Sequence, residues 1–364
     1  MSSKDQNYDL THISKSVFNT VNRLSCEYVN FKYIDHGGFG HVIQACQRID
    51  NIIYAIKCLN VTNPTKLYEG LNEIRTIALM DHPNIMRYYI SWFQFDIVGT
   101  YDGLTGIDQL NISEESFDDH ILLQSHSMNK ESDTSKCDFE TSEYDAETSE
   151  YMHGQIANTL IPYNPVIDQL KPEFIGKKYE INIYIQMQFC RMNLKQWIES
   201  REVVDKSMTY QIIYEILKGL QYIHKKGIIH RDLKPGNIFI YHEKDIERYT
   251  IKLGDFGLST FDDGSLHQSK VGTNMYASPE QKNEQAYDSR SDLYSLGIII
   301  FELLYPLKTF MEKVKCIEEI RKNKFPSDIS NFINFEIQEI ISNLISDTPD
   351  SRPSIDKMLK AFHL

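Results

Sequence analysis

Residues 229–237 read Ile229-His230-Arg231-Asp232-Leu233-Lys234-Pro235-Gly236-Asn237, and Asp255-Phe256-Gly257 follows 18 positions after Asn237. The first stretch offers a carboxylate, an amine and an amide within a few residues. The second stretch adds another carboxylate on a separate segment. Either motif alone could arise by chance, but both together, in this order and at this spacing, point to a single chemical site.

The residue types in these two stretches fit the transfer of a phosphoryl group. An attacking hydroxyl needs a carboxylate that accepts its proton, and metal ions that bridge the phosphates of ATP need oxygen ligands from a second loop. Asp232 is the expected base, and Lys234 is the expected cation beside the transferring group; a lysine at that place favours a Ser/Thr acceptor. Asn237 and Asp255 are the expected Mg2+ ligands. We interpret His230 as an apolar-packed scaffold residue.

Composition indicates a globular chain without a membrane span. The 364 residues are 41% hydrophobic and 12% aromatic, which is enough for a packed core of two lobes. The six cysteines form no Cys-x-x-Cys pair, so neither a disulfide framework nor a zinc site is indicated, and a reducing compartment fits best. The N-terminus has no basic start followed by an apolar core, and we therefore expect a cytoplasmic protein.

The negative charge is concentrated in one segment. The net charge of −13 argues against a nucleic-acid-binding surface, and residues 97–178 alone contribute −11, from 16 Asp and Glu against 5 Lys. This segment repeats the motif Glu140-Thr-Ser-Glu-Tyr144 as Glu147-Thr-Ser-Glu-Tyr151. It cannot bury enough apolar surface to offset its ordering entropy, so we predict disorder. A passive surface loop and a regulatory or phosphorylatable segment are equally compatible with this composition.

The apolar spacing predicts an α+β fold with two lobes. Residues 31–92 alternate as strands do, apart from a helical stretch at 67–80, and the alternation resumes at 182–189. Beyond Arg191 the spacing is helical. We predict a small β-rich N-lobe with one main helix and a larger helical C-lobe. The expected boundaries are an extension at 1–22, an N-lobe at 23–190 interrupted by the insert at 97–178, and a C-lobe at 191–364.

Two features of the predicted N-lobe suit a nucleotide. Gly37, Gly38 and Gly40 lie between predicted strands, where backbone amides could close over phosphates, although glycine clusters usually mark ordinary turns. Lys57 is the one charge in the apolar stretch Tyr54-Ala-Ile-Lys57. A buried ammonium needs a partner, and Glu73 on the helical stretch is well placed to be that partner. The alternative, an edge-strand lysine that meets solvent, is disfavoured by the other motifs.

The glycine loop, Lys57, Glu73, the His-Arg-Asp loop, Asp-Phe-Gly and Ser278-Pro279-Glu280 together resemble the eukaryotic protein kinase family, from Arg23 to Leu364. The resemblance implies the bilobal protein kinase fold, with ATP and Mg2+ as cofactors. It also implies that Glu280 pairs with Arg352 and that Asp292 holds the catalytic-loop backbone. By the same resemblance, the residues that bind ATP are Gly37, Gly38, Gly40, Val42, Ala55, Lys57, Glu73, Met187, Gln188 and Cys190.

A narrower resemblance concerns the kinases of the alpha subunit of translation initiation factor 2. It is carried by the segments 87–92, 184–190, 271–281 and 301–306 together with the acidic insert. It implies a serine on that factor as substrate and a shutdown of translation under stress. Two other functions stay open, namely a Ser/Thr kinase of another pathway, such as a cell-cycle kinase, and a pseudokinase scaffold. The intact catalytic set counts against the scaffold.

Regulation is predicted at two places. Arg23 and Glu27 stand where this family carries a pair that bridges two molecules back to back; the alternative is an intrachain i,i+4 pair worth about a few tenths of a kcal/mol. We favour the homodimer. Arg231 would be an uncompensated charge unless a phosphate on the activation segment neutralised it, so we hypothesise autophosphorylation in trans at Thr273 or Ser269. The alternatives are that Thr273 only hydrogen-bonds the catalytic loop and that Ser269 is a solvated loop serine.

Two residues depart from the family pattern. Asp35 replaces the first glycine of the phosphate loop, and a carboxylate there is expected to weaken ATP binding by repulsion. In the helix that the family uses to dock its substrate, Glu318 of Glu318-Glu319-Ile320-Arg321 replaces a common Thr. The prediction of the substrate is therefore weaker than the prediction of a kinase.

Overall fold

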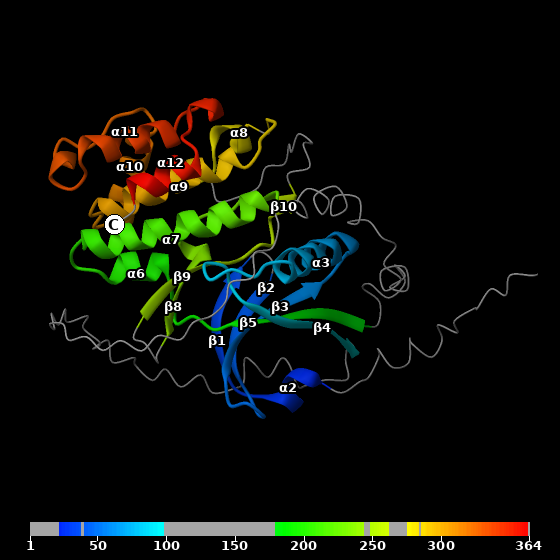
Figure 1. The fold of residues 1–364 in the computed structure, drawn as a ribbon. Helices are drawn as coiled ribbons and strands as arrows, with labels where there is room; N and C mark the ends of the chain where they lie inside the picture. Colours follow the sequence, from blue (N-terminus) through cyan, green and yellow to red (C-terminus); the bar gives the residue numbers. More distant parts are fainter. Residues whose placement is uncertain are drawn as a thin grey trace, which may run out of the picture. The chain divides into compact units, whose positions relative to one another are not determined.

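The computed structural model describes residues 22–37, 40–97, 179–243, 248–261, 275–283 and 285–362. Within these ranges an antiparallel sheet with one long helix is followed by a mostly helical region (Figure 1), which confirms the predicted α+β fold class. The predictions for the insert, Gly38, Ser269 and Thr273 concern residues outside these ranges. In the described part of the chain, no helix has the length and apolar character needed to span a membrane.

The N-terminal sheet has five antiparallel strands in the order β1-β2-β3-β5-β4. They are β1 (Tyr28–Gly37), β2 (Gly40–Gln47), β3 (Ile53–Val61), β4 (Tyr88–Ile97) and β5 (Tyr179–Gln188). Ile97 at the end of β4 pairs with Tyr179 at the start of β5. The sheet therefore resumes after the insert as predicted, and residues 98–178 connect two neighbouring strands.

One face of this sheet carries an aromatic core. Trp92 stacks with Tyr28 and with Tyr184, with ring centroids 6.0 and 5.2 Å apart, respectively. The Tyr28 hydroxyl donates to Gln186 Oε1 at 2.9 Å, which gives this buried polar group a hydrogen-bond partner. The short helix α2 (Arg23–Glu27) begins at the capping residue Asn22 and adds Leu24 to the same core.

The main helix of this region is α3 (Pro64–Ala78). It begins three residues earlier than the apolar spacing predicts, because Asn63 accepts from the Lys66 N–H and Pro64 occupies the first helical position. Gly70 lets the helix approach the sheet, since a Cβ there would lie 2.9 Å from the side chain of Ile183. This close packing brings Glu73 toward β3.

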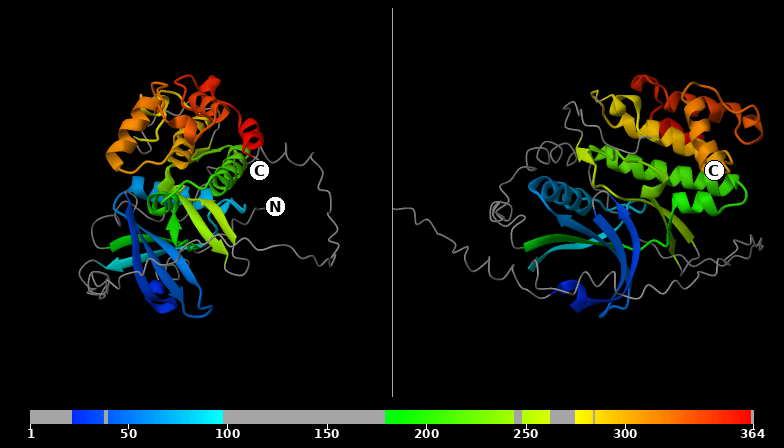
Figure 2. Two further views of the ribbon diagram at one scale, coloured as in Figure 1. Left: turned by 90° about the vertical axis from the view of Figure 1, so that its left-hand side faces the viewer. Right: turned by 180° about the vertical axis from the view of Figure 1, so that it is seen from behind.

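The helical region is built around α9 (Arg290–Leu304), whose residues are buried from Ser291 to Leu304. A helix that is buried on all sides forms the core of its region. It packs against both α7 (Lys206–Lys225) and α11 (Phe335–Leu344), as the two views in Figure 2 show. The other helices are α6 (Leu194–Ser200), α8 (Pro279–Lys282), α10 (Phe310–Ile320), α12 (Ile355–Ala361), and the 3-10 turns η3 (Pro235–Asn237), η4 (Ile329–Asn331) and η5 (Pro349–Ser351).

Five short strands position the two chemical motifs. They are β6 (Met192–Asn193), β7 (Ile228–Ile229), β8 (Ile238–Glu243), β9 (Arg248–Leu253) and β10 (Thr260–Phe261). The loop with Asp232 begins directly after β7, which pairs with β10, and Asp255 follows two residues after β9. The end of β9 is hydrogen-bonded to residues 84–86, which precede β4, through Leu253 N to Asn84 O (2.9 Å) and Met86 N to Leu253 O (2.8 Å).

Candidate active site

Lys57 on β3 joins three separate parts of the chain. Its Nζ lies 2.7 Å from Glu73 Oε1 on α3 and 2.8 Å from Asp255 Oδ1 on the loop after β9. The Lys57 side chain is only 9% exposed, so the cation is buried and has the partner that the sequence predicts. Burial alone would lower the pKa of Lys57, but attraction to the two carboxylates outweighs burial and raises the pKa above its usual value.

The two carboxylates around Lys57 differ in environment. The Glu73 side chain is 3% exposed and that of Asp255 is 32% exposed. Burial raises the pKa of Glu73 in spite of the lysine, whereas at Asp255 the charge of Lys57 outweighs burial and lowers the pKa. Gly257 permits this arrangement, since a Cβ there would lie 3.1 Å from Glu73 Oε2. Burial therefore dominates at Glu73, whereas the charge of Lys57 dominates at Asp255.

The loop after β7 brings the predicted base, cation and metal ligand into contact. Lys234 Nζ lies 2.6 Å from Asp232 Oδ2, and Asn237 Nδ2 donates to the same oxygen at 3.0 Å. Asn237 Nδ2 also donates to the backbone oxygen of Asp232 at 2.9 Å. Asp232 and Asn237 are both buried. Two donors that converge on one oxygen fix the orientation of the Asp232 carboxylate.

The backbone at this site is strained in a way that sequence reasoning missed. Arg231 has a φ of 71° and Asp255 a φ of 59°, in the left-handed region, which costs about 1–3 kcal/mol for a residue other than glycine. Asp292 on α9 holds the first of these loops: its carboxylate accepts from the His230 N–H and the Arg231 N–H, both at 2.9 Å. His230 is fully buried against Phe256, with centroids 5.0 Å apart, in keeping with a scaffold role.

The side chain of Arg231 lies over the ring of Tyr287, with 5.6 Å between the guanidinium carbon and the centroid. Burial lowers the pKa of Arg231, although Tyr287 and Asp292 oppose this shift. The charge therefore has neighbours in its own chain, so the expectation of an uncompensated charge is too simple. Phosphorylation at Thr273 or Ser269 stays a prediction.

Four of the ten predicted nucleotide residues share one face of the sheet. Val42 pairs with Lys57 and Ala55 pairs with Met187, and cross-strand partners lie on the same face. Lys57 and Ala55 are two residues apart on β3, so they too share that face. The structure thus brings all four together. Gln188 and Cys190 follow on the segment after Met187, where the Gln188 N–H donates to Arg87 O at 2.9 Å and burial raises the pKa of the Cys190 thiol to about 12.

The glycine loop is described in part. Gly37 ends β1 and pairs with Gly40 at the start of β2. Gly40 has a φ of 138°, and a Cβ there would lie 2.0 Å from Cys58 O, so no other residue fits without backbone movement. Asp35 is exposed on β1, opposite Val42. The effect of its carboxylate on ATP binding stays a prediction.

The donor set fits a magnesium ion that arrives with a nucleotide. Mg2+ prefers hard oxygen ligands and is usually bound by one or two protein groups together with substrate phosphates. Asn237 turns its Nδ2 toward Asp232, and Asp255 directs Oδ1 toward Lys57. Across the described ranges no group of three or more His, Cys, Asp or Glu could hold a metal by itself.

The two residues predicted to bridge a dimer form an ion pair with each other within one chain. Arg23 Nε lies 2.8 Å from Glu27 Oε1, with side chains 34% and 35% exposed, and the Arg23 guanidinium also lies 4.8 Å from the centre of the Trp92 ring. The intrachain alternative is thus present in the single chain, and a bridge between two molecules stays a prediction. At the segment Glu318–Arg321, where the resemblance implies substrate docking, Glu318 is exposed, while Arg321 donates to Met275 O of its own chain.

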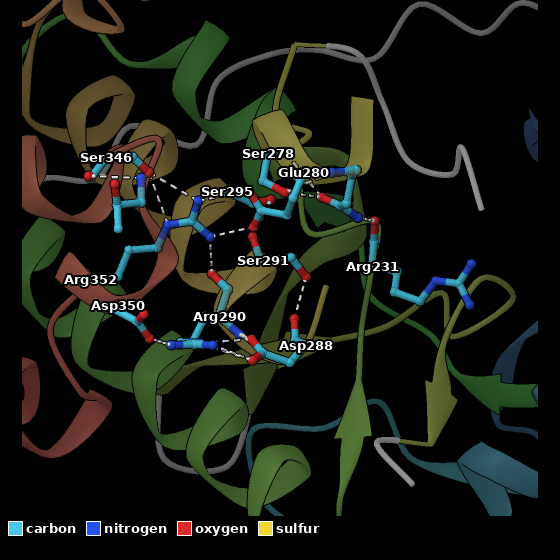
Figure 3. Close-up of polar contacts among 12 residues, drawn as sticks. Arg231, Ser278, Glu280, Asp288, Arg290, Ser291, Ser295, Ser346, Asp350 and Arg352 are labelled. Atoms are coloured by element: carbon cyan, nitrogen blue, oxygen red, sulfur yellow. Dashed lines mark hydrogen bonds and ion pairs between the residues drawn. The ribbon is translucent and has the colours of Figure 1, made fainter. Parts of the chain in front are cut away.

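A buried ion pair anchors α8, as Figure 3 shows. Arg352 Nη1 and Nη2 lie 2.5 and 2.9 Å from the two oxygens of Glu280, the pairing that the family resemblance implies. Arg352 also donates to the backbone oxygens of Ser346 and Arg290. The segment Ser278-Pro279-Glu280 is therefore fixed to the segment between α11 and α12.

The amino-acid sequence of this chain is similar to those of known protein kinases. The family described as "Protein kinase domain" matches residues 128–363. The mouse (Mus musculus) "Interferon-induced, double-stranded RNA-activated protein kinase" is 32% identical over 346 residues, which cover 93% of this chain and 51% of that protein. The "eIF-2-alpha kinase GCN2" of Schizosaccharomyces pombe is 29% identical over 377 residues, 94% of this chain and 23% of that protein.

A third relative is the "Eukaryotic translation initiation factor 2-alpha kinase 1" of Rattus norvegicus. It is 27% identical over 426 residues, which cover 92% of this chain and 67% of that protein. The chain spans about half the length of the mouse and rat RNA-activated kinases that it matches, 51% and 54%.

Proposed function

The chain belongs to the protein kinase domain family, and from this premise we propose that it transfers the γ-phosphoryl group of ATP to serine or threonine hydroxyls of a protein. The observation that carries the proposal is that two polar clusters lie on adjoining backbone segments, since the Gly254 N–H, next to Asp255, donates to Asn237 O at 3.0 Å. One is Lys57 with Glu73 and Asp255, and the other is Asp232 with Lys234 and Asn237. This set supplies a base, cations and oxygen ligands.

The residues would divide the chemistry as follows. Asp232 accepts and orients the proton of the attacking hydroxyl, and Lys234 places a positive charge where the transferring group becomes more negative. Lys57, held by Glu73, binds ATP phosphates. Asn237 and Asp255 would hold Mg2+, which when bound neutralises phosphate charge. Buried partners keep these groups oriented before the substrate arrives.

For the substrate, we propose the alpha subunit of translation initiation factor 2. The support is the printed function of the relatives and the four shared sequence segments with the acidic insert. A kinase of another pathway is the second candidate, favoured by Glu318 in the docking helix. Autophosphorylation, a cytoplasmic location and a back-to-back homodimer stay predictions.

A single assay tests these proposals. The full chain is incubated with radiolabelled ATP, Mg2+ and recombinant initiation factor alpha subunit, either wild type or with its target serine changed to alanine, and with a generic basic protein. Among the added proteins we expect label on the wild-type subunit and on neither the alanine form nor the basic protein, and we expect the label to be lost with an Asp232→Asn chain. Label on the basic protein but not on the subunit would favour another pathway. No label anywhere would favour a scaffold and contradict the proposed activity.

A further inference from the structure

Gln281, at the third position of α8, connects this helix to the loop that carries Asp232. Its side chain is buried, with the residue 1% exposed. Its Oε1 accepts from the Ser278 N–H and the Ser278 hydroxyl, both at 3.1 Å, and its Nε2 donates to the backbone oxygen of Arg231 at 3.1 Å. Figure 3 shows Arg231 beside Ser278 and Glu280. One amide thus bridges the anchored α8 and the catalytic loop.

The bridge ends at the strained residue of that loop. Arg231 has its φ of 71° held on the N–H side by Asp292, at 2.9 Å, and on the C=O side by Gln281. The C=O of Arg231 and the N–H of Asp232 belong to one planar peptide unit. A side chain that fixes this oxygen therefore also fixes the peptide plane that precedes the Cα of Asp232.

The chemistry of this contact requires an amide. Only a side chain with an acceptor on one atom and a donor on the other satisfies Ser278 and the Arg231 oxygen together. A leucine would leave buried polar groups without partners, and a carboxylate would serve Ser278 but repel the oxygen of Arg231. Since Glu280 is fixed by Arg352, the amide extends that anchor to the loop.

We propose that Gln281 is a positioning residue for phosphoryl transfer, which holds the peptide between Arg231 and Asp232 in its strained orientation. This inference rests on the proposed kinase activity. Misplacement of a reacting group by about 1 Å can cost on the order of 100-fold in rate. Loss of the contact should therefore lower kcat and leave the KM for ATP nearly unchanged.

The chain offers a matched control. Gln196 occupies the same third position in α6, where its Oε1 accepts from the Asn193 N–H at 2.9 Å, but its side chain is exposed, whereas that of Gln281 is buried and donates to Arg231 O. We compare Gln281→Leu and Gln281→Glu with Gln196→Leu and Gln196→Glu in the full chain. The expected result is a fall in kcat of about 10- to 100-fold for the Gln281 variants and a change of less than about 2-fold for the Gln196 variants.

The pH dependence separates positioning from packing. A protonated carboxyl can donate to the Arg231 oxygen, and burial favours the protonated form. The activity of Gln281→Glu relative to wild type should therefore rise as the pH falls, while Gln281→Leu should show no such recovery. Equal pH profiles for the two variants would contradict the proposal.

Hydrogen exchange provides a readout that does not need activity. Backbone amides of residues 229–237 should exchange faster in Gln281→Leu than in wild type or Gln196→Leu, with α9 unaffected. Unchanged exchange in this loop, or an increase that spreads equally to α9, overturns the positioning role. If wild type transfers no phosphate but the loop alone exchanges faster in Gln281→Leu, the proposed function fails and the positioning contact stands.

Discussion

At the scale of single residues, Lys57 shares one charge between a buried and a partly exposed carboxylate. Glu73 depends on that charge more, because its side chain has almost no access to water. An ionised carboxylate in such a place is strongly unfavourable without a cation. The pair therefore contributes to stability, and this contribution can be separated from its proposed role in nucleotide binding.

The substitution Lys57→Met should destabilise the fold and abolish transfer. With its cation removed, Glu73 is expected to take up a proton, and loss of one partner of a buried pair costs about 3–5 kcal/mol. The double variant Lys57→Met with Glu73→Leu should regain most of this stability but no activity. Denaturant unfolding and the radiolabel assay measure the two quantities. A Lys57→Met chain as stable as wild type would contradict the argument.

At the scale of elements, the four-residue helix α8 is too short to be stable alone, and its position depends on Arg352. The Arg352 side chain is fully buried against Glu280. Its other donations, to the oxygens of Ser346 and Arg290, tie α8 to α9 and to the segment after α11. The stability of α8 therefore comes from tertiary contacts.

The substitution Arg352→Met should lower the free energy of unfolding by about 3–5 kcal/mol, because it leaves Glu280 buried without a cation. Replacing both partners, with Arg352→Met and Glu280→Leu, should recover part of this loss. Recovery is incomplete because the oxygens of Ser346 and Arg290 still lack their donor. A double-mutant cycle by denaturant unfolding measures the coupling. Additive losses in the double variant would show that the pair is not the anchor.

Some elements and contacts could be predicted from the sequence for definite physical reasons. A lone charge in an apolar strand requires a partner, and this requirement identified Glu73 as the residue beside Lys57. By contrast, the residue type of Arg231 does not indicate its positive φ, since glycine, Asn and Asp are the types that favour that conformation. The contact from Gln281 to Arg231 joins residues 50 apart, and its existence depends on how α8 packs.

At the scale of the whole molecule, several carboxylates share one direction of pKa shift. Burial alone would raise the pKa of Glu280 and of Asp292, but hydrogen bonds and charge from Arg352 and His224, respectively, outweigh it and lower both. Unfolded Asp and Glu titrate near about 3.9 and 4.3. Below those values and down to the lower folded pKa, the unfolded chain binds more protons than the folded chain.

The free energy of unfolding should therefore fall as the pH drops below about 4, by up to about 1.4 kcal/mol per pH unit for each such group. Above the unfolded pKa values the contribution of these groups is fully present. Denaturant unfolding at a series of pH values measures the slope. Arg352→Met should show a shallower slope than wild type, because it removes the cause of the Glu280 shift. An unchanged slope would contradict the assignment.

The dimer prediction also belongs to this scale. The intrachain contact between Arg23 and Glu27 determines which variants can test it. A double charge reversal restores the contact within one chain as well as a bridge between chains, so it does not separate them. The single variants Arg23→Glu and Glu27→Arg each abolish the intrachain pair. When the two are mixed, opposite charges meet only across two molecules. Sedimentation should therefore show a mixed dimer in preference to either self-dimer.

The size of the effect follows from the exposure of the pair. Exposed ion pairs contribute about 0.2–1 kcal/mol each. A two-fold axis would produce two equivalent bridges in the dimer. The mixture should therefore associate roughly 2- to 30-fold more tightly than each variant alone. The intrachain contact of Arg23 with Trp92 is absent from every Arg23→Glu chain, whether that chain is free or paired, and so it does not bias the association constant. High salt should remove the preference. Equal association of the mixture and the separate variants would leave Arg23 and Glu27 as an intrachain pair only.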